Sequence, residues 1–314
     1  MIICCGEALI DFIPTSDGSA YRPCPGGSIL NIAVGLGRMK VPVGFLSRLS
    51  IDIFGTFLTN HLLKDTVNLE YCPRVEGQTT LAFVSLQEKP EHEPLYAFYA
   101  NGAVDRSMIV DGLPEQFDDD VLALHFGSIS LVLEPGATTL ETLMKRESRR
   151  RILTLDPNVR PVLITNEKAY RQRFCEWISL IDILRLSQVD MEYLYPDTGI
   201  EELLPLWFDA GVSLILLTHG SKGSHGYLPN GINVFVPVPK VAVKDTVGAG
   251  DAYFAAVLAY LYDHGKLTDS SLISGMSTID LKACMEFATK AAAINCTREG
   301  ADPPYKHEMD SNNN

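Results

Sequence analysis

Short apolar runs alternate with longer amphipathic stretches along most of the chain. The runs, which predict strands, cover residues 2–5, 43–49, 121–126, 152–155, 183–186 and 212–217. The stretches that predict helices cover residues 29–39, 53–63, 138–145, 167–178 and 200–208, and an Ala-rich helix is expected over 281–294. Strands that alternate with helices are typical of a mostly parallel sheet with helices on both faces. The pattern therefore predicts an α/β fold.

Two segments interrupt this alternation with strand-like sequence of mixed polarity. They cover residues 11–25 and residues 79–86 with 95–99, and the polar, Pro-bearing stretch 87–94 is expected to be a hairpin loop. Strands outside the main sheet suggest a small lid that excludes water from a site beneath it. Edge strands without a catalytic role are the alternative. We therefore expect one domain over 1–306, with lid strands from about 11–25 and 79–100, and a disordered polar tail over 307–314.

Composition favours a protein that binds small molecules rather than nucleic acid. The 314 residues carry a formal net charge of −13, from 26 Lys and Arg against 39 Asp and Glu. Such acidity is unsuited to a nucleic-acid surface, and a phosphate site would have to use backbone dipoles and a few local cations. No apolar stretch reaches the roughly 18 residues that a membrane-spanning helix needs.

Cysteine usage and the first residues bear on location. The 7 cysteines are scattered, and no Cys-x-x-Cys pair occurs. This argues against a zinc or redox motif and favours reduced thiols in a cytoplasmic protein. Residues 1–7 lack a basic region, so we expect a strand there rather than a signal peptide.

The most informative chemistry lies in residues 245–254, which read DTVGAGDAYF and precede an apolar helical run. The small residues Gly248, Ala249 and Gly250 let a ligand approach the backbone. Unpaired N–H groups and the positive end of the helix dipole attract phosphate there. Asp251 would repel that phosphate, and its natural use is as a general base for an attacking hydroxyl. The combination predicts a small-molecule kinase; the alternative is a Gly-rich turn whose Asp stabilises the helix start through the dipole alone.

Two further features suggest a sugar site. Gly26 and Gly27 precede the helix that carries Asn31, whose amide both donates and accepts hydrogen bonds, as sugar hydroxyls require. An ordinary helix-start turn is the alternative. Asp11 follows the apolar residues 8–10, and we expect it at the carboxyl edge of the first strand, where ligands of open α/β sheets gather.

Polar residues also follow two later strands. The sequence DPNVRP at 156–161 brings Asp156 and Arg160 to a strand end. Arg160 would bind substrate or phosphate there, and Asp156 would act through Mg²⁺-bound water. A surface ion pair between these two residues is the alternative. The turn THGSKG at 218–223 follows the strand at 212–217 and suits nucleotide phosphates or ribose.

Several common nucleotide-binding motifs do not occur in the sequence. There is no Gly-x-x-x-x-Gly-Lys-Ser/Thr, so the chain has no Walker loop, and no Gly-x-Gly-x-x-Gly, which weakens a dinucleotide-binding interpretation. The His-Arg-Asp and Asp-Phe-Gly signatures of protein kinases are also missing. A kinase with this sequence belongs to another structural class.

From about residue 5 to 304 the sequence resembles the ribokinase-like carbohydrate kinases, the PfkB family. The two signatures of that family match Gly26-Gly27-x-x-x-Asn31, with Ala33 and Gly37, and Asp245-Thr246-x-Gly248-Ala249-Gly250-Asp251. Within the family the sequence is most similar to bacterial fructokinases, through the stretches GEALID at 6–11, YAFY at 96–99, LHFGS at 124–128, DPNVRP at 156–161 and TREGA at 297–301. The resemblance implies a three-layer sandwich with a small β lid, and ATP-dependent phosphorylation of a sugar hydroxymethyl group.

The resemblance also implies roles for residues of this sequence. The base would be Asp251, and the anion hole would be formed by Gly248, Ala249 and Gly250. Sugar contacts would come from Asp11, Gly27, Asn31, Phe98 and Arg160. Nucleotide contacts would come from Ser187, Thr218, Gly220 and Gly223, with Asn295 near the adenine. A monovalent cation such as K⁺ would bind backbone carbonyls near Asp245, Val247 and Gly300 and polarise the anion hole.

Three stretches depart from the family pattern. The family's Asn-x-x-Glu, linked to Mg²⁺, is Ser187-x-x-Asp190 here, which keeps a shortened carboxylate that would act on Mg²⁺ through water. Tyr253 and Ala256 replace the commoner Phe and Gly after the catalytic Asp, a change expected to affect packing. Residues 50–55 keep the Asp and the second Gly of a family loop but not its first Gly.

Motifs and resemblance together predict a cytoplasmic, ATP- and Mg²⁺-dependent sugar kinase that converts fructose to fructose 6-phosphate. A kinase for another sugar or sugar acid, such as ribose or 2-keto-3-deoxygluconate, is an open alternative. So is an inactive paralogue that binds sugar or nucleotide for regulation, whereas the missing glycine motif disfavours a nicotinamide dehydrogenase. Sugar and ATP are the expected partners, with no nucleic acid and no membrane, and an exposed lid sheet suggests a homodimer.

Overall fold

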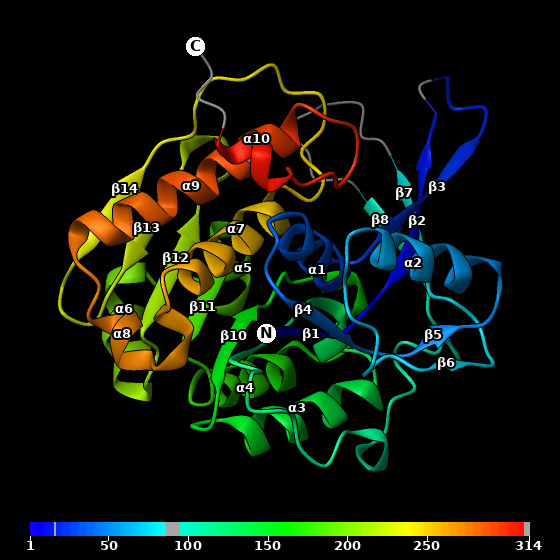
Figure 1. The fold of residues 1–314 in the computed structure, drawn as a ribbon, viewed down its shortest axis with the longest axis horizontal. Helices are drawn as coiled ribbons and strands as arrows, with labels where there is room; N and C mark the ends of the chain where they lie inside the picture. Colours follow the sequence, from blue (N-terminus) through cyan, green and yellow to red (C-terminus); the bar gives the residue numbers. More distant parts are fainter. Residues whose placement is uncertain (16, 86–94, 311–314) are drawn as a thin grey trace.

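The computed structural model describes residues 1–15, 17–85 and 95–310 (Figure 1). The parallel strands of its largest sheet are β1 (Ile2–Cys5), β4 (Val43–Leu46), β9 (Ala123–Gly127), β10 (Ile152–Asp156), β11 (Ile183–Ser187) and β12 (Leu214–Thr218). Two antiparallel strands, β13 (Ser224–Tyr227) and β14 (Asn233–Val236), extend one edge. The order across the 8-stranded sheet is β14-β13-β12-β11-β10-β9-β1-β4. The predicted α/β fold with a mostly parallel sheet is confirmed.

Helices cover both faces of this sheet (Figure 1). One face carries α1 (Ser28–Arg38), α2 (Ile53–Lys64), α7 (Ala249–Asp263), α8 (Ser270–Ser274) and α9 (Thr278–Cys296). The other carries α3 (Gly136–Glu147), α4 (Glu167–Ile178), α5 (Gln188–Leu194) and α6 (Ile200–Ala210). Successive strand side chains point to opposite faces, so Ile2 and Cys4 join the first core while Ile3 and Cys5 join the second. None of the helices in these described segments is long and apolar enough to cross a membrane.

A second, smaller sheet stands beside the main one. Its strands are β2 (Leu9–Pro14), β3 (Tyr21–Gly26), β7 (Leu81–Ser85) and β8 (Leu95–Tyr99), in the order β3-β2-β7-β8. Strands outside the main sheet were predicted from both segments, and both contribute. The expected hairpin loop at 87–94, and residue 86 at the end of one predicted strand, lie outside the described residues.

The position predicted for Asp11 is wrong. The first strand of the main sheet ends at Cys5, and Asp11 lies inside β2 of the small sheet. The reason is strand pairing, because Asp11 is in register with Cys24 of β3 and Ala82 of β7 rather than with a strand of the main sheet. Asp11 therefore reaches any ligand from the small sheet above the site, not from a strand end beneath it.

Several elements were not predicted from the sequence. A two-stranded sheet pairs β5 (Leu49–Ser50) with β6 (Arg74–Val75). The β13–β14 hairpin was also missed, although Pro229-Asn230-Gly231 between its strands is a turn signal. Short 3₁₀ turns lie at Val110–Gly112, Ser128–Leu131, Pro161–Leu163, Gly220–Lys222 and Lys266–Thr268.

The C-terminal segment also differs from its prediction. The disordered tail expected over 307–314 is wrong for residues 307–310, which belong to α10 (Lys306–Asp310). Tertiary contacts are the reason: Met309 is buried, and the Lys290 ammonium donates to its carbonyl oxygen at 2.8 Å. Residues 311–314 lie outside the described part of the chain.

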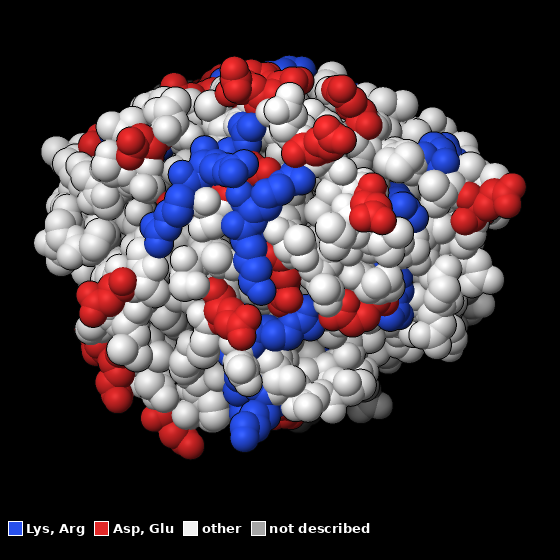
Figure 2. All heavy atoms as spheres, turned by 90° about the horizontal axis from the view of Figure 1, so that it is seen from below, with Lys and Arg blue, Asp and Glu red and all other residues white. Residues whose placement is uncertain are grey.

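Charge is unevenly distributed over the surface. On the side of the molecule where α3 and α4 lie, Lys and Arg side chains gather in a central band with Asp and Glu around it (Figure 2). Hydrogen bonds show how arginines of this region are used: Arg151 Nη2 donates to the Phe117 carbonyl at 2.9 Å, and Arg146 pairs with Glu147 at 2.8 Å. These two guanidinium groups therefore stabilise the fold through hydrogen bonds and ion pairs, in addition to contributing surface charge.

Candidate active site

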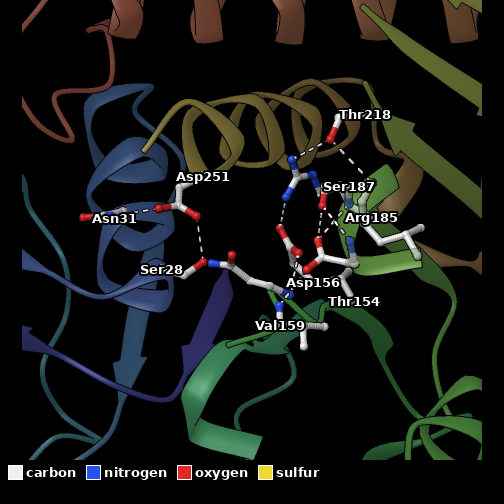
Figure 3. Close-up of polar contacts among 12 residues, drawn as sticks. Ser28, Asn31, Thr154, Asp156, Val159, Arg185, Ser187, Thr218 and Asp251 are labelled. Atoms are coloured by element: carbon white, nitrogen blue, oxygen red, sulfur yellow. Dashed lines mark hydrogen bonds and ion pairs between the residues drawn. The ribbon is translucent and has the colours of Figure 1, made fainter. Parts of the chain in front are cut away.

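The carboxylate predicted to be the base lies in the first turn of α7, held by two side chains of α1 (Figure 3). Ser28 Oγ donates to one oxygen of Asp251 at 2.7 Å, and Asn31 Nδ2 donates to the other at 2.8 Å. The two helices approach closely, because a Cβ at Gly35 would lie only 2.7 Å from that of Ala255. The contact between α1 and α7 therefore fixes the direction in which the Asp251 carboxylate points. Ser28 was not singled out from the sequence.

The backbone that opens α7 has the features of an anion site. Gly248 is the N-cap with φ of 72°, and a Cβ there would lie 2.5 Å from that of Ala301, so only glycine fits. The Ala249 N–H is already used, donating to the Thr246 carbonyl at 3.2 Å. For the N–H of Gly250 there is no acceptor among the described residues. This donor, at the positive end of a 15-residue helix, remains available to a phosphate.

The residues predicted to bind a monovalent cation are brought together behind this turn. Asp245 accepts from the N–H of Val247 at 3.0 Å and from that of Gly300 at 2.8 Å. Asn295 donates to the Val247 carbonyl at 2.8 Å and accepts from the Asp302 N–H at 2.9 Å. Asn295 is fully buried, with 0% of its surface exposed, so it joins these loops and has no surface to offer adenine. We correct its predicted nucleotide role on this ground.

Side chains suited to a sugar face the same region from the small sheet and from the loop that follows β10. Arg160 stacks over the ring of Tyr96, with Cζ 5.7 Å from the ring centroid, and Tyr96 stacks on Phe98 at 5.7 Å. Burial raises the pKa of Asp11 to about 7, while the positive charge of Arg160 lowers this pKa and the negative charge of the Asp251 carboxylate raises it. These mutual effects place Asp11 and Arg160 near the base. Tyr96 was not predicted as a site residue. It lies two residues before Phe98 in β8, and side chains two residues apart in a strand point to the same face.

Two glycines allow this arrangement. A Cβ at Gly26 would collide with the Asp11 carboxylate, and one at Gly27, where φ is 103°, would lie 3.0 Å from Glu7 Cγ. Glu7 is buried and accepts from the Ile29 N–H at 3.4 Å and from Ser130 Oγ. Burial raises the pKa of Glu7 to about 7, with these hydrogen bonds opposing the shift. Glu7 therefore supports the turn that opens α1.

A buried ion pair lies at the carboxyl ends of the central strands. Asp156 is fully buried, and Arg185 Nη1 donates to its Oδ2 at 2.6 Å. Arg185 Nη2 donates to Thr218 Oγ1 at 2.8 Å (Figure 3). The expected alternative, a surface pair between Asp156 and Arg160, is not formed: Arg160 Nη1 donates to Asn158 Oδ1 at 2.7 Å. Arg185 was missed from the sequence, although a charge inside the apolar run ILRL was a usable signal.

The departure at Ser187-x-x-Asp190 has a structural explanation. Ser187 caps α5, its hydroxyl and N–H bonding one oxygen of Asp190 at 2.6 and 2.9 Å. The other oxygen of Asp190 accepts from the Val159 N–H at 2.7 Å. Ser187 and Asp190 therefore hydrogen-bond to each other, and Asp190 also holds the loop that follows β10.

These contacts do not fit a protein-bound Mg²⁺. The oxygens of Asp156 accept from Arg185 and from the Asn158 N–H at 3.2 Å, and those of Asp190 are engaged as described. No group of three or more His, Cys, Asp or Glu side chains in the described residues is placed to hold a metal ion. The expected metal role of Asp156 and Asp190 finds no support in their geometry.

The glycines of the turn after β12 differ in their surroundings. Gly220 has φ of 56°, and a Cβ there would have no atom within 4 Å, so its backbone is open to a ligand. A Cβ at Gly223 would collide with the Val236 carbonyl, so that glycine is needed for packing against β14. Of the predicted nucleotide contacts, Gly220 is exposed and Ser187 and Thr218 are half-buried, whereas Gly223 is buried.

Known proteins are similar to this chain in sequence and in fold. The model of the pfkB family of carbohydrate kinases matches residues 1–308. The chain is 36% identical over 277 residues to a fructokinase of Rhizobium leguminosarum bv. trifolii, covering 87% of this chain and 83% of that protein. It is 30% identical over 321 residues to fructokinase-1 of Zea mays, covering 99% and 96% of the two chains. The fold is similar to that of a crystal structure of fructokinase with bound ATP from Xylella fastidiosa, with a TM-score of 0.89, 27% identity, and coverage of 98% and 96%.

Proposed function

The chain belongs to the pfkB family of carbohydrate kinases, and we propose that it is a fructokinase that transfers the γ-phosphoryl group of ATP to the terminal hydroxyl of fructose. It is a phosphotransferase with an alcohol as acceptor. The observation that carries the proposal is the Asp251 carboxylate, oriented by Ser28 and Asn31 beside an open helix N-terminus. A base beside an anion site is the combination that phosphoryl transfer to a hydroxyl requires.

In the proposed reaction Asp251 removes the proton of the sugar hydroxyl. The hydroxyl oxygen forms a bond to the γ-phosphorus as the bond from that phosphorus to the β-phosphate oxygen breaks. ADP leaves with the electron pair, and the proton stays on the Asp251 carboxyl until solvent takes it. The Gly250 N–H, with Gly248 and Ala249 shaping the turn, offsets the charge that develops on the transferred group.

We assign the sugar to the space between α1 and the small sheet. Asp11 and Asn31 offer oxygens to hydroxyl groups, Arg160 offers N–H donors, and Phe98 with Tyr96 offers an aromatic face. Gly27, the N-cap of α1, would offer its backbone to the sugar at the start of that helix. In this role the small sheet is a lid that excludes water from the phosphoryl group.

ATP is the donor in this proposal, with its phosphates between the start of α7 and the turn at Thr218 and Gly220. Mg²⁺ would enter as the counter-ion of ATP, held by phosphate and water oxygens, and no step is assigned to it because Asp156 and Asp190 are already engaged. K⁺ would bind the backbone carbonyls around Asp245, Val247 and Gly300, which hydrogen bonds hold together.

We also propose a homodimer formed through the outer face of the small sheet. Phe83 stacks on Phe12 there at 4.7 Å, and the neighbouring Tyr21 and Tyr99 are 48% and 65% exposed. A second copy of this aromatic face would cover it. The molecular mass in solution checks this assembly.

A sugar panel tests the proposed substrate. ADP release with Mg²⁺-ATP and K⁺ is measured across fructose, ribose, 2-keto-3-deoxygluconate, adenosine and glucose. The proposal expects the highest kcat/KM with fructose. A higher kcat/KM with another acceptor would reassign the sugar and leave the kinase in place, whereas ATP binding without turnover on any acceptor would favour a regulatory binding protein.

A further inference from the structure

Arg185 is a buried cation in the middle of the main sheet. Its side chain is 8% exposed, although it comes from the otherwise apolar strand β11. The guanidinium is fixed on two sides, by Asp156 at 2.6 Å and by Thr218 at 2.8 Å (Figure 3). A cation is costly to bury, so its position calls for a reason beyond the fold.

The guanidinium lies against the anion site that opens α7. A Cβ placed on Gly250 would be 2.7 Å from Arg185 Nη2 and 3.0 Å from Nη1. The Gly250 N–H and the Arg185 guanidinium therefore border the same small volume. Thr218, the half-buried residue that begins the nucleotide turn, contacts the same Nη2.

The guanidinium has donors to spare. Of its five N–H groups, one donates to Asp156 and one to Thr218, and Nε is buried without an acceptor among the described residues. An unused buried donor is unfavourable in the free protein, and a phosphate oxygen is a strong acceptor for it.

The surrounding charges are negative. The carboxylates of Asp156, Asp190 and Asp251 raise the pKa of Arg185 against the opposing effect of burial, so the guanidinium stays charged. Without Arg185, a triphosphate brought to this place would meet only those carboxylates. Asp156 accepts from Arg185 and Asp190 accepts from the Val159 N–H, so neither carboxylate is placed to hold a metal cation there instead. A fixed cation beside the phosphates removes this conflict.

We propose that Arg185 binds the terminal phosphates of the nucleotide and stabilises the transferred phosphoryl group together with the Gly250 N–H. The inference rests on the proposed function, because it requires a nucleoside polyphosphate at the start of α7. It assigns a role to a residue outside both glycine motifs.

Binding of AMP and ADP with Mg²⁺, measured by calorimetry on the full chain, separates phosphate recognition from general effects. Removing Arg185 alone would leave Asp156 buried and unpaired, so the test compares Asp156→Asn with the double variant Asp156→Asn, Arg185→Gln. Arg171→Gln, which removes a charge from the surface of α4, is the matched control for long-range electrostatics. Melting temperatures report whether each variant folds.

The double variant should bind ADP about 10- to 100-fold more weakly than Asp156→Asn, with AMP binding changed by less than about threefold, as expected when charged hydrogen bonds to the outer phosphates are lost. Arg171→Gln should change neither. An ADP-to-AMP affinity ratio that shifts by less than about threefold would overturn the role of Arg185, whereas ADP binding by the wild type would still support the kinase proposal. A wild-type protein that binds neither ADP nor ATP would overturn both.

Discussion

Asn31 donates from Nδ2 to the Asp251 carboxylate at 2.8 Å and so joins the helices that follow the two glycine motifs. The motifs are 220 residues apart along the chain, yet they build one catalytic unit. Asn31 was expected to contact the sugar, and its amide oxygen remains suited to that. Its NH₂ group orients the base.

Asn31→Ala should lower kcat by about 10- to 100-fold, because a hydrogen bond to a charged group contributes roughly 1.5–3 kcal/mol. Steady-state kinetics with saturating ATP and sugar measure it, and Ser28→Ala, which removes the other bond to Asp251, is the matched comparison. A kcat within about twofold of the wild type for both variants would show that the carboxylate does not depend on α1.

Gly250→Val should block phosphate approach, because any Cβ there lies 2.7 Å from Arg185 and beside the free N–H. We expect ADP binding by calorimetry to be lost. Gly199→Val is the control, since Gly199 at the start of α6 has an ordinary φ of −76° and a Cβ there would meet only Glu202 Oε1, at 4.0 Å. ADP binding that survives in Gly250→Val would refute the anion site.

The affinity for sugar should increase as pH rises through about 7, where burial places the pKa of Asp11. The ionised carboxylate accepts hydroxyl donors more strongly than the protonated form. The KM for sugar, measured from pH 5.5 to 8.5 in wild type and Asp11→Asn, checks this. The dependence should disappear in the variant, and an identical profile in both proteins would remove Asp11 from sugar binding.

The free energy of unfolding should depend on pH through the titration of Glu7. Burial raises its pKa from 4.5 to about 7, so between these values the folded protein keeps a proton that the unfolded chain loses. The free energy of unfolding contributed by Glu7 therefore falls as pH rises across this window, by up to about 3 kcal/mol. Urea unfolding at pH 5 and pH 8 should show the wild type losing stability relative to Glu7→Gln. The exposed control Glu70→Gln should differ from the wild type equally at both pH values, and the same result for Glu7→Gln would contradict the prediction.

Strand and helix positions were predictable where hydrophobic periodicity reports them. The run 2–5 coincides with β1, and 167–178 coincides with α4. The side chains that these elements bury recur in the sequence with the spacing of a strand or of a helix, so the elements can be located from it. The β13–β14 hairpin is short and partly polar, and only its Pro-Asn-Gly turn marked it. Helix α10 depends on Met309 and Lys290, a contact between distant residues that local pattern cannot report.

Site residues in glycine motifs were predictable because only glycine fits there, as at Gly248 and Gly27. What a polar side chain does was harder to predict, because it depends on its neighbours in space. Asn295 hydrogen-bonds to the backbone of two loops, at Val247 and at Asp302. Asp190 is part of the capping box of its own helix, α5. Arg185, placed by the parallel register of β11 with β12, lay outside every motif.

The most direct test of the account is single-turnover phosphoryl transfer by Asp251→Asn, with ATP and fructose bound. The variant keeps the shape of the side chain and one oxygen acceptor but removes the base. We expect ADP binding close to that of the wild type and a transfer rate lower by about 10²- to 10⁴-fold. A transfer rate within about tenfold of the wild type would contradict the assignment of Asp251 as the base and, with it, the mechanism proposed here.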